Sequence, residues 1–475
     1  MHGLHMTADT RVVQSYSWIG NALRSRTGMV LTCMLYVVTF RVVYEWVIVP
    51  LWGYEGFNSR ATITRDAIGG TLAWLPGLWM PIKLERPSQV LYWVLYLLVV
   101  VPTCLVAICA LEDQSSGPIL LATCVVTVFA LIGLVYQLPL LPLPQVHIEN
   151  YEFGAILVLL STTFYSFLVS SFGFKFHFVS LQDIYSVRAQ YENTLAGAPT
   201  LVAYAISWQA WVINPFVMAM GLRWRRLSWV LVGAVAQFAI YSITGFRSMF
   251  FSAGLLLYLL WSMRSVTAFG TRLASTWTAI FAGAGALQLF GYALTPAALV
   301  NMRMAALPGL LTGYYYEFFS SHPHAQLGHS IFKMLVNYPY AVQPPYLIAA
   351  TYFHNATMES NANLWADAYA NFGYFGIFAF SLLLALVLWL YDSMAFGRDK
   401  RLAAMAISLP AFALANTGLL TALLTNGIGL VMLLVYLMPP TMHERSRKKK
   451  TLGRRGRSTS LPSQTRSIEE WNATN

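Results

Sequence analysis

Apolar runs of about twenty residues recur along almost the whole length of this chain of 475 residues. A run of that length crosses roughly 30 Å of hydrocarbon as an α-helix, and only a helix or a closed barrel pairs the backbone polar groups there. The composition agrees, since 57% of the residues are hydrophobic and 10% are charged, whereas roughly a quarter are charged in soluble domains. The sequence therefore predicts an all-α polytopic membrane protein with no separate soluble domain.

We expect about twelve transmembrane helices. Two segments have an alternative interpretation: residues 67–82 are short and contain Pro76, which is also typical of a re-entrant or interfacial helix. The stretch 402–440 forms two short spans only if it folds back near residues 421–426. The expected ranges are 28–51, 67–82, 89–111, 118–138, 152–172, 198–221, 227–244, 248–262, 274–296, 372–391, 402–420 and 424–440.

The loops between these spans differ in positive charge, and Lys and Arg are retained on the cytoplasmic side of a membrane. With the N-terminus inside, the cytoplasmic segments contain most of the 30 Lys and Arg residues. The distribution therefore predicts that both termini lie in the cytoplasm. The residues assigned to the inside are Arg11, Arg24, Arg26, Lys83, Arg86, Arg223, Arg225, Arg226, Arg264, Arg272, Arg398, Lys400, Arg401 and those after Met442; those assigned to the outside are Arg60, Arg65, Lys175, Arg188, Arg247, Arg303 and Lys333.

The chain divides into a cytoplasmic leader (1–27), a transmembrane domain (28–440) and a basic tail (441–475) that we expect to be disordered. The tail has two interpretations: attachment to anionic lipid or to a partner, or a plain positive anchor after the last span. Nucleic-acid binding is not indicated, because no folded module is present to carry it. Inside the first span, Arg41 and Glu45 are spaced i, i+4 and are expected to neutralise one another.

Two loops on the external side are long, at residues 173–197 and 297–371. The second is aromatic and amphipathic, and its residues 302–319 are expected to form a helix that lies in the membrane interface. It is rich in Tyr, His, Asn and Arg, whose side chains hydrogen-bond sugar hydroxyls and phosphate oxygens. These loops are the predicted functional surface.

Arg247 stands alone between the apolar runs 227–244 and 249–261, at the external end of a span. It is level with Arg188 in the first external loop and Arg303 in the second. Three guanidinium groups at one boundary would form a diphosphate clamp, because arginine offers planar bidentate donors and keeps its charge. The alternative for each is a helix-end arginine that extends to the interface.

Several short motifs resemble the Wzy-type polymerases, which join oligosaccharide repeat units in O-antigen and exopolysaccharide synthesis. They are "TGFRS" between two spans, "DIYSVR" in the first external loop, "R-x4-P" (Arg303 to Pro308) followed by "YYYEFF" and "HP" in the second, and "NANLWADAYANFGYFG" entering a late span. The resemblance covers roughly residues 150–392.

The resemblance implies a glycosyltransferase of the bacterial inner membrane with a membrane-embedded C-type fold. Such an enzyme transfers a growing glycan from its undecaprenyl diphosphate carrier to the next lipid-linked repeat unit, without a metal cofactor. It also implies a chain-length regulator as a possible partner. Within the motifs, Arg247, Arg303 and Arg188 are assigned to the diphosphate, with Lys333 as a reserve, and Tyr185 and Asn363 to substrate binding.

The acceptor hydroxyl needs a general base, and an imidazole titrates in a suitable range. His322 ranks first, since the following proline restricts its backbone; the other candidates are His324, His329, Glu317 and Asp367. Each candidate has an alternative role. The histidines would only provide a hydrogen-bonding surface, and Glu317 would pair with an arginine. Asp367 and Asn371, one helical turn apart, would share a face or serve as helix caps. Tyr315 and Tyr316 would stack on sugars or anchor the loop at the interface.

The main alternative function is a flippase or transporter for a lipid-linked oligosaccharide. A carrier needs polar groups along a path through the bilayer, often formed by broken helices, whereas the ionisable residues of this chain gather at the external end. A membrane acyltransferase and a scaffold are further alternatives. An intramembrane histidine would favour the former, and the latter leaves the arginines unexplained.

Overall fold

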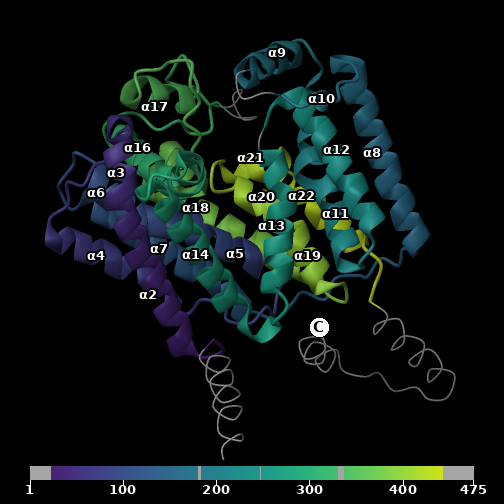
Figure 1. Ribbon diagram of the computed structural model, residues 1–475, viewed down its shortest axis with the longest axis horizontal. Coiled ribbons are helices and arrows are strands. Elements are labelled where there is room, and N and C mark those ends of the chain that lie inside the picture. The colour runs from purple at the N-terminus through teal and green to yellow at the C-terminus, as the bar shows by residue number, and fades with distance from the viewer. Residues whose placement is uncertain (1–22, 180–182, 247, 330–335, 442–475) are drawn as a thin grey trace, which may run out of the picture.

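The computed structural model describes residues 23–179, 183–246, 248–329 and 336–441, and the regular elements in these ranges are helices (Figure 1). Within this part of the chain, nine helices are long and apolar enough to cross a membrane, or ten if one bent pair forms a single span. The prediction of a polytopic α-helical membrane protein is therefore confirmed.

The nine candidate spans carry the following labels in Figure 1. They are Arg26–Glu55 (with α2 at Arg26–Val43 and α3 at Val49–Trp52), Gln89–Ala110 (α5 at Gln89–Leu95, α6 at Ile108–Ala110), Gly117–Gln137 (α7 at Gly117–Gly133), Asn150–Phe172 (α8), Thr200–Arg223 (α10 at Thr200–Trp208, α11 at Asn214–Arg223), Leu227–Thr244 (α12), Leu294–Ser321 (α15 at Leu294–Pro296, α16 at Leu307–Ser321), Leu364–Met394 (α18) and Leu419–Leu437 (α21 at Leu419–Leu424, α22 at Ile428–Leu437).

The bent pair, Phe251–Ser262 and Val266–Leu289, meets at 102° and contains most of α13 (Ser248–Ser262) and all of α14 (Phe269–Leu289). They correspond to the predicted spans 248–262 and 274–296, but the second ends at Leu289, and a new helix begins at Leu294. The predicted span 402–420 is instead two short helices, α19 (Lys400–Ala406) and α20 (Ser408–Ala413). Neither reaches the length that a span requires.

The predicted span 67–82 is also too short by itself, because it consists of α4 (Ile63–Trp74) and one turn of 3₁₀ helix, Leu75–Leu78. It nevertheless runs antiparallel to α2. Arg41, near one end of α2, binds Asp66 with an Nε–Oδ1 distance of 2.7 Å, and Arg26, at the other end, donates to the Met80 carbonyl over 2.6 Å. The two arginines are fifteen positions apart, which corresponds to about 22 Å of helix.

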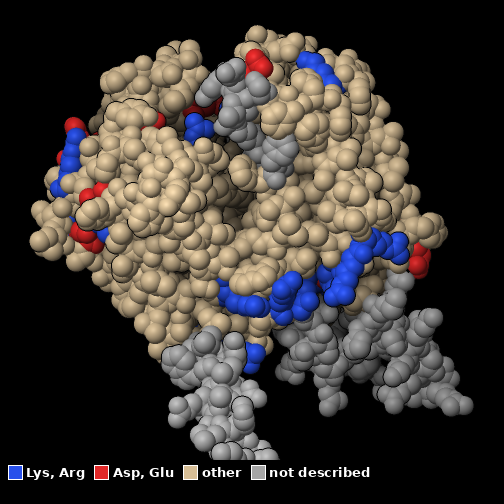
Figure 2. Space-filling view, viewed as in Figure 1, with Lys and Arg blue, Asp and Glu red and all other residues tan. Residues whose placement is uncertain are grey.

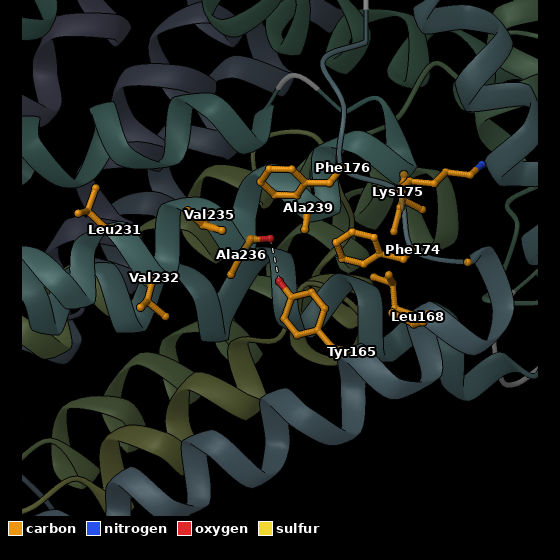
Figure 3. A pocket seen from close by; sticks show the side chains of 13 residues that line it. Tyr165, Leu168, Phe174, Lys175, Phe176, Leu231, Val232, Val235, Ala236 and Ala239 are labelled. Atoms are coloured by element: carbon orange, nitrogen blue, oxygen red, sulfur yellow. Dashed lines mark hydrogen bonds between the residues drawn. The ribbon is translucent and has the colours of Figure 1, made fainter.

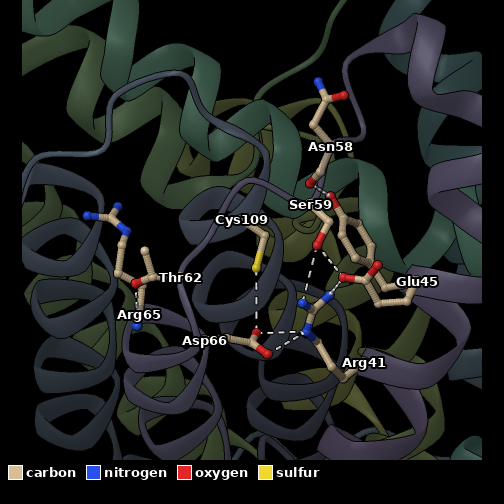
Figure 4. A network of polar contacts seen from close by, with 9 residues as sticks. Arg41, Glu45, Asn58, Ser59, Thr62, Arg65, Asp66 and Cys109 are labelled. Carbon is tan, nitrogen blue, oxygen red and sulfur yellow. Dashed lines mark hydrogen bonds and ion pairs between the residues drawn. The ribbon is translucent and has the colours of Figure 1, made fainter.

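A polar network joins α2 to α4 at this end (Figure 4). The guanidinium of Arg41 lies between the carboxylates of Glu45 and Asp66, and Ser59 donates to Glu45. The thiol of Cys109 lies 3.6 Å from Asp66 Oδ1. The expected neutralisation of Arg41 by Glu45 is therefore present, and Asp66 is a second counter-ion that links two helices.

The helix expected to lie in the membrane interface at residues 302–319 is instead part of the longer candidate span Leu294–Ser321, and most of its side chains from 307 to 319 are buried in the bundle. It packs against α14, α18 and the turn Thr103–Ala107, because small residues let it approach its neighbours closely. A Cβ atom on Gly309 would lie 2.3 Å from the Pro102 carbonyl oxygen. Residues 297–371 are therefore not one external loop: they also contain α17 (Pro344–Tyr352) and the start of α18.

Basic side chains gather along one edge of the molecule, which Figure 2 shows as a blue band. The loops of this edge contact one another: Arg223 Nε binds Asp399 over 2.7 Å, Arg86 donates to the Val135 carbonyl over 3.1 Å, and Arg398 donates to the Tyr436 carbonyl over 2.9 Å. We call this edge the basic end. It contains the inter-helix segments assigned to the inside by charge, apart from residues outside the described ranges.

Candidate functional site

A sharp bend interrupts α18. Phe372 and Gly373 have non-helical backbone angles, with φ 59° and ψ −144° at Gly373. The indole N–H of Trp365 donates to Ser381 Oγ over 3.0 Å, although sixteen residues of straight helix would separate them by about 24 Å. Residues 364–371 therefore fold back against the helix that follows. We call 364–371 the re-entrant helix and 374–394 the long arm.

Glycine is required where the re-entrant helix touches the long arm. A Cβ atom on Gly376 would lie 2.0 Å from the carbonyl oxygen of Ala368. Gly373 has a positive φ, which disfavours other residues, and the imidazole of His324 lies over it: a Cβ there would be 3.2 Å from Nε2. The sequence "NFGYFG" thus forms the turn of a helical hairpin.

Asn363 begins the re-entrant helix as its N-cap. Its side-chain oxygen accepts from the backbone N–H groups of Trp365 and Ala366, at 3.0 and 3.2 Å. Its amide donates to Thr312 Oγ1 over 2.7 Å and to the Pro308 carbonyl over 3.0 Å. The side chain, predicted to bind substrate, is thus buried and joins the re-entrant helix to α16.

The segment after α16 covers the other end of the re-entrant helix. The backbone N–H groups of Ala325 and Gln326 donate to the carbonyls of Ala370 and Asn371, at 2.8 and 3.2 Å. The N–H of Leu327 donates to Asn371 Oδ1 over 2.7 Å. Gln326 and Leu327 adopt positive φ, and the hydrogen bonds tie this turn to the helix end. Asn371 is buried and holds the two segments together.

Asp367 lies on the re-entrant helix and is partly buried. The amide of Asn371 is 3.3 Å from its Oδ1, so the two side chains share a face as predicted. On the other side lies Gly418, where a Cβ atom would be 2.4 Å from Asp367 Oδ2. No salt bridge to Asp367 is found among the described residues. This carboxyl group is enclosed by α18 and the segment before α21.

His324 lies against the tip of the hairpin. Its ring is 6.4 Å from that of Phe319 and 5.9 Å, edge to face, from that of Tyr369. Nδ1 of His324 is buried without a hydrogen-bond partner in the described chain. Since buried polar atoms are normally paired, this nitrogen marks a position for a water molecule or a ligand.

His322 follows α16 directly and is exposed. Its ring stacks on Phe318 with centroids 4.2 Å apart, and Nδ1 lies 2.9 Å from the Phe318 carbonyl oxygen. A carbonyl only accepts, so this bond places the proton on Nδ1. In the neutral ring, Nε2 then keeps its lone pair and is available as a base.

The carboxylate of Glu317 lies beside Tyr352 of α17. The pKa of the Tyr352 hydroxyl is raised mainly by burial and further by the charge of this carboxylate. The ring of Tyr352 stacks on Tyr314 with centroids 4.1 Å apart. Among the described contacts, Glu317 therefore pairs with a tyrosine rather than with the arginine considered above.

The two tyrosines assigned to sugar stacking differ in position. Tyr315 is buried, and its hydroxyl donates to the Ser360 carbonyl over 2.9 Å. Tyr316 is partly exposed, and its ring lies 5.3 Å from that of Tyr369. Of the two, Tyr316 is the one that a ligand could reach.

His329 is partly buried near Tyr338, with ring centroids 5.8 Å apart. Burial lowers the pKa of His329, so its neutral form is favoured. Like His324, its Nδ1 is buried without a described hydrogen-bond partner. His329 thus adds a third imidazole to the segment that covers the re-entrant helix.

The segments corresponding to the two external loops approach one another at the end opposite the basic end. Tyr346 in α17 donates to Glu359 over 2.7 Å. The pKa of Tyr346 is raised to about 12, first by this hydrogen bond and then by burial. The charge of Glu192 in α9 (Ile184–Ala196) adds a smaller contribution. Figure 1 shows α9 and α17 on the same side of the molecule.

Of the three arginines of the expected clamp, Arg188 and Arg303 lie on different elements of the described chain. Arg188 in α9 lies with Cζ 5.3 Å from the ring of Phe246, and its Nη2 donates to the Gly245 carbonyl over 3.4 Å. Arg303 is exposed on the π-helical turn Ala297–Ala306, which packs on other elements, chiefly α14. Arg247 and Lys333 lie outside the described residues, as does the side chain of Tyr185.

Sequence reasoning missed Thr312, Gly418, Tyr369 and the re-entrant form of 364–371. The last had a signal: Asn363 can cap a helix, and "NFG" places two turn-forming residues eight and ten positions later. Thr312 and Gly418 had none, because each acts through a contact between distant segments.

In the described part of the chain, no three His, Cys, Asp or Glu side chains lie close enough together to hold a metal ion. Comparisons with protein-family models, with curated proteins and with solved structures found no match. The fold and the arrangement of residues around the re-entrant helix are therefore the basis for any functional inference.

Proposed function

We propose that the chain is a membrane-embedded glycosyltransferase that polymerises lipid-linked oligosaccharide repeat units at the end opposite the basic end. The observation that carries the proposal is the grouping around the tip of the re-entrant helix. His324 and partly exposed Tyr316 both lie against Tyr369 of the re-entrant helix, with ring centroids 5.9 and 5.3 Å apart. Asp367 lies on the same helix, and His322 is two residues before His324. The motif resemblance to Wzy-type polymerases includes these same segments.

In the proposed reaction, a hydroxyl of the acceptor sugar attacks the anomeric carbon of the donor glycan. The bond from that carbon to the diphosphate oxygen breaks, and the polyprenyl diphosphate leaves with the bonding electrons. The hydroxyl proton passes to a base on the protein. Arginines near the leaving group would stabilise its developing charge, and Arg188 is the described candidate because it lies next to Phe246, one residue before Arg247.

His322 is the preferred base. Its Nε2 is available because the Phe318 carbonyl accepts the proton of Nδ1, and its exposure lets an acceptor hydroxyl approach. Asp367 and His324 are more enclosed, which suits them to positioning the acceptor or the hairpin.

The test uses purified full-length protein in detergent, lipid-linked repeat units, no nucleotide and no ion gradient. We expect extension of the repeat units, because the diphosphate linkage itself supplies the driving force. His322→Ala should lower kcat by roughly two to four orders of magnitude with KM little changed. His147→Ala, an exposed histidine on the segment that contacts Arg398 at the basic end, is the matched control.

A transporter for the same lipid-linked sugar is the second candidate, and the re-entrant helix favours it. Transporters bind substrates with broken helices within the bilayer, and α18 is such a helix. Transport moves the lipid between two leaflets without forming a bond. A substrate-binding preparation that never forms longer products, but moves the lipid across liposome membranes, would replace the polymerase proposal by this one.

A further inference from the structure

An apolar groove of about 580 Å³ lies between α8 and α12. Figure 3 shows Tyr165, Ala236 and Ala239 within it and Phe174 and Phe176 beside them. Leu231 and Val232 lie at one end of the lining and Lys175 at the other. The end of the groove that contains Lys175 lies far from the basic end, because Lys175 is in the segment between α8 and α9.

The groove is open because two of its lining residues on α12 are alanines and its tyrosine is held by a hydrogen bond. Ala236 and Ala239 leave space that larger side chains would fill. The Tyr165 hydroxyl donates to the Ala236 carbonyl over 2.7 Å, so the ring presents only its apolar face. The lining therefore makes no hydrogen-bonding demand on an occupant and suits hydrocarbon.

The groove faces the lipid side of the bundle. Val169, Leu231 and Val232 line it and are 42%, 55% and 63% exposed. They belong to two candidate membrane spans. A hydrocarbon chain could enter sideways from the bilayer without passing through water.

One end of the groove is cationic. Lys175 Nζ lies 3.1 Å from the neutral Gln190 Oε1 in α9, and Arg188 is two residues away on the same helix. The segment that carries Lys175 is fixed to α12, because the backbone N–H of His177 donates to Ser242 Oγ over 3.2 Å. An anionic group on a chain lying in the groove would thus meet positive charge.

We propose that this groove binds the hydrocarbon chain of the lipid-linked substrate and that Lys175 binds its phosphate. The inference rests on the proposed function for the identity of the lipid. A cavity of this volume is in the usual range for small-molecule sites, so it holds the part of a long chain next to the phosphate, and the remainder stays in the bilayer. The chain would then direct the saccharide towards α9 and Arg188.

The experiment uses full-length protein in nanodiscs of neutral phosphatidylcholine and a polyprenyl phosphate with a photoreactive diazirine near its phosphate. We expect cross-links to peptides of α8 and α12. Ala239→Phe should fill the groove and reduce cross-linking at least about tenfold, which corresponds to about 1.4 kcal/mol. The control Leu159→Phe adds a similar ring on the exposed face of α8, outside the groove, and should leave cross-linking unchanged.

The charge is tested separately. Lys175→Glu should also reduce cross-linking about tenfold, while Lys175→Arg should retain it, since a positive charge remains. This pair changes no side-chain packing within the bilayer, so it remains informative if Ala239→Phe fails to accumulate.

Two results would overturn the inference. One is wild-type cross-linking in both Ala239→Phe and Lys175→Glu. The other is equal labelling of the groove by a diazirine-bearing phosphatidylglycerol, which would make the occupant an ordinary membrane lipid. Specific labelling by polyprenyl phosphate in a protein that never extends repeat units would keep the lipid site and reject only the polymerase.

Discussion

Trp365 donates to Ser381 across the bend of α18, over 3.0 Å, and this contact shows how a helix of 31 residues fits a bilayer. A straight helix of that length would measure about 46 Å, against roughly 30 Å of hydrocarbon. The bend leaves residues 374–394, about 31 Å, for the crossing. It returns the first eight residues into the protein, where Asn371 accepts from the segment after α16 and its amide lies beside Asp367.

The close contact within the hairpin predicts that replacing Gly376 destabilises the fold strongly. Gly376→Ala should prevent the contact with Ala368, because the added Cβ would lie 2.0 Å from a backbone oxygen that cannot move alone. We expect a loss of several kcal/mol, above the roughly 0.5–3 kcal/mol of most substitutions, seen as low yield or a large fall in Tm. Gly283→Ala on α14 is the control, with no atom within 4 Å of the new Cβ. Equal stability of the two variants would contradict the re-entrant arrangement.

The network at Arg41 predicts that removing this arginine lowers the stability of the fold more than removing the exposed Arg60 does. Arg41→Ala would leave Glu45 and Asp66 without their partly buried counter-ion, at about 1–3 kcal/mol, less than a fully buried pair would cost. Arg60→Ala removes the pair with Glu112, which is 82% exposed, and should cost at most about 1 kcal/mol. Thermal unfolding of both variants in one detergent measures the difference. A smaller shift for Arg41→Ala than for Arg60→Ala would refute this role.

Sequence reasoning identified the individual helices better than their connections. Hydropathy located spans such as 89–111 and 227–244 because each is a continuous apolar run long enough to cross a bilayer, whatever its neighbours are. It misplaced residues 302–319, whose burial within the bundle depends on how closely Gly309 packs against Pro102. It assigned Asn363 to a ligand, whereas the buried side chain caps a helix and bonds Thr312, because capping and ligand binding use the same amide group.

The charge distribution predicts the orientation. In a cysteine-free background, Arg225→Cys at the basic end and Ala356→Cys at the opposite end are both exposed positions. A membrane-impermeant maleimide applied to intact cells with a permeable outer membrane should label Ala356→Cys and leave Arg225→Cys unlabelled until the inner membrane is broken. Labelling of Arg225→Cys in intact cells would invert the assignment and place the re-entrant helix on the cytoplasmic side, where the proposed polymerisation does not take place.

Arg247 gives the sharpest test of the proposed chemistry, because it follows Phe246, the ring beside which Arg188 lies. If its guanidinium binds the leaving diphosphate, a lysine cannot reproduce the two parallel hydrogen bonds. Arg247→Lys should therefore lose most polymerisation, and Arg247→Ala nearly all, a fall in kcat of roughly two to three orders of magnitude.

The control is Arg264→Ala, an exposed arginine between α13 and α14 on the side of the basic end, which should leave the polymer unchanged. Membrane levels of all three variants are compared with those of the wild type, and product length is read on gels. Full-length polymer from Arg247→Ala would exclude the diphosphate role. Loss of polymer in Arg247→Ala, but full activity in Arg247→Lys, would reduce that role to a simple positive charge.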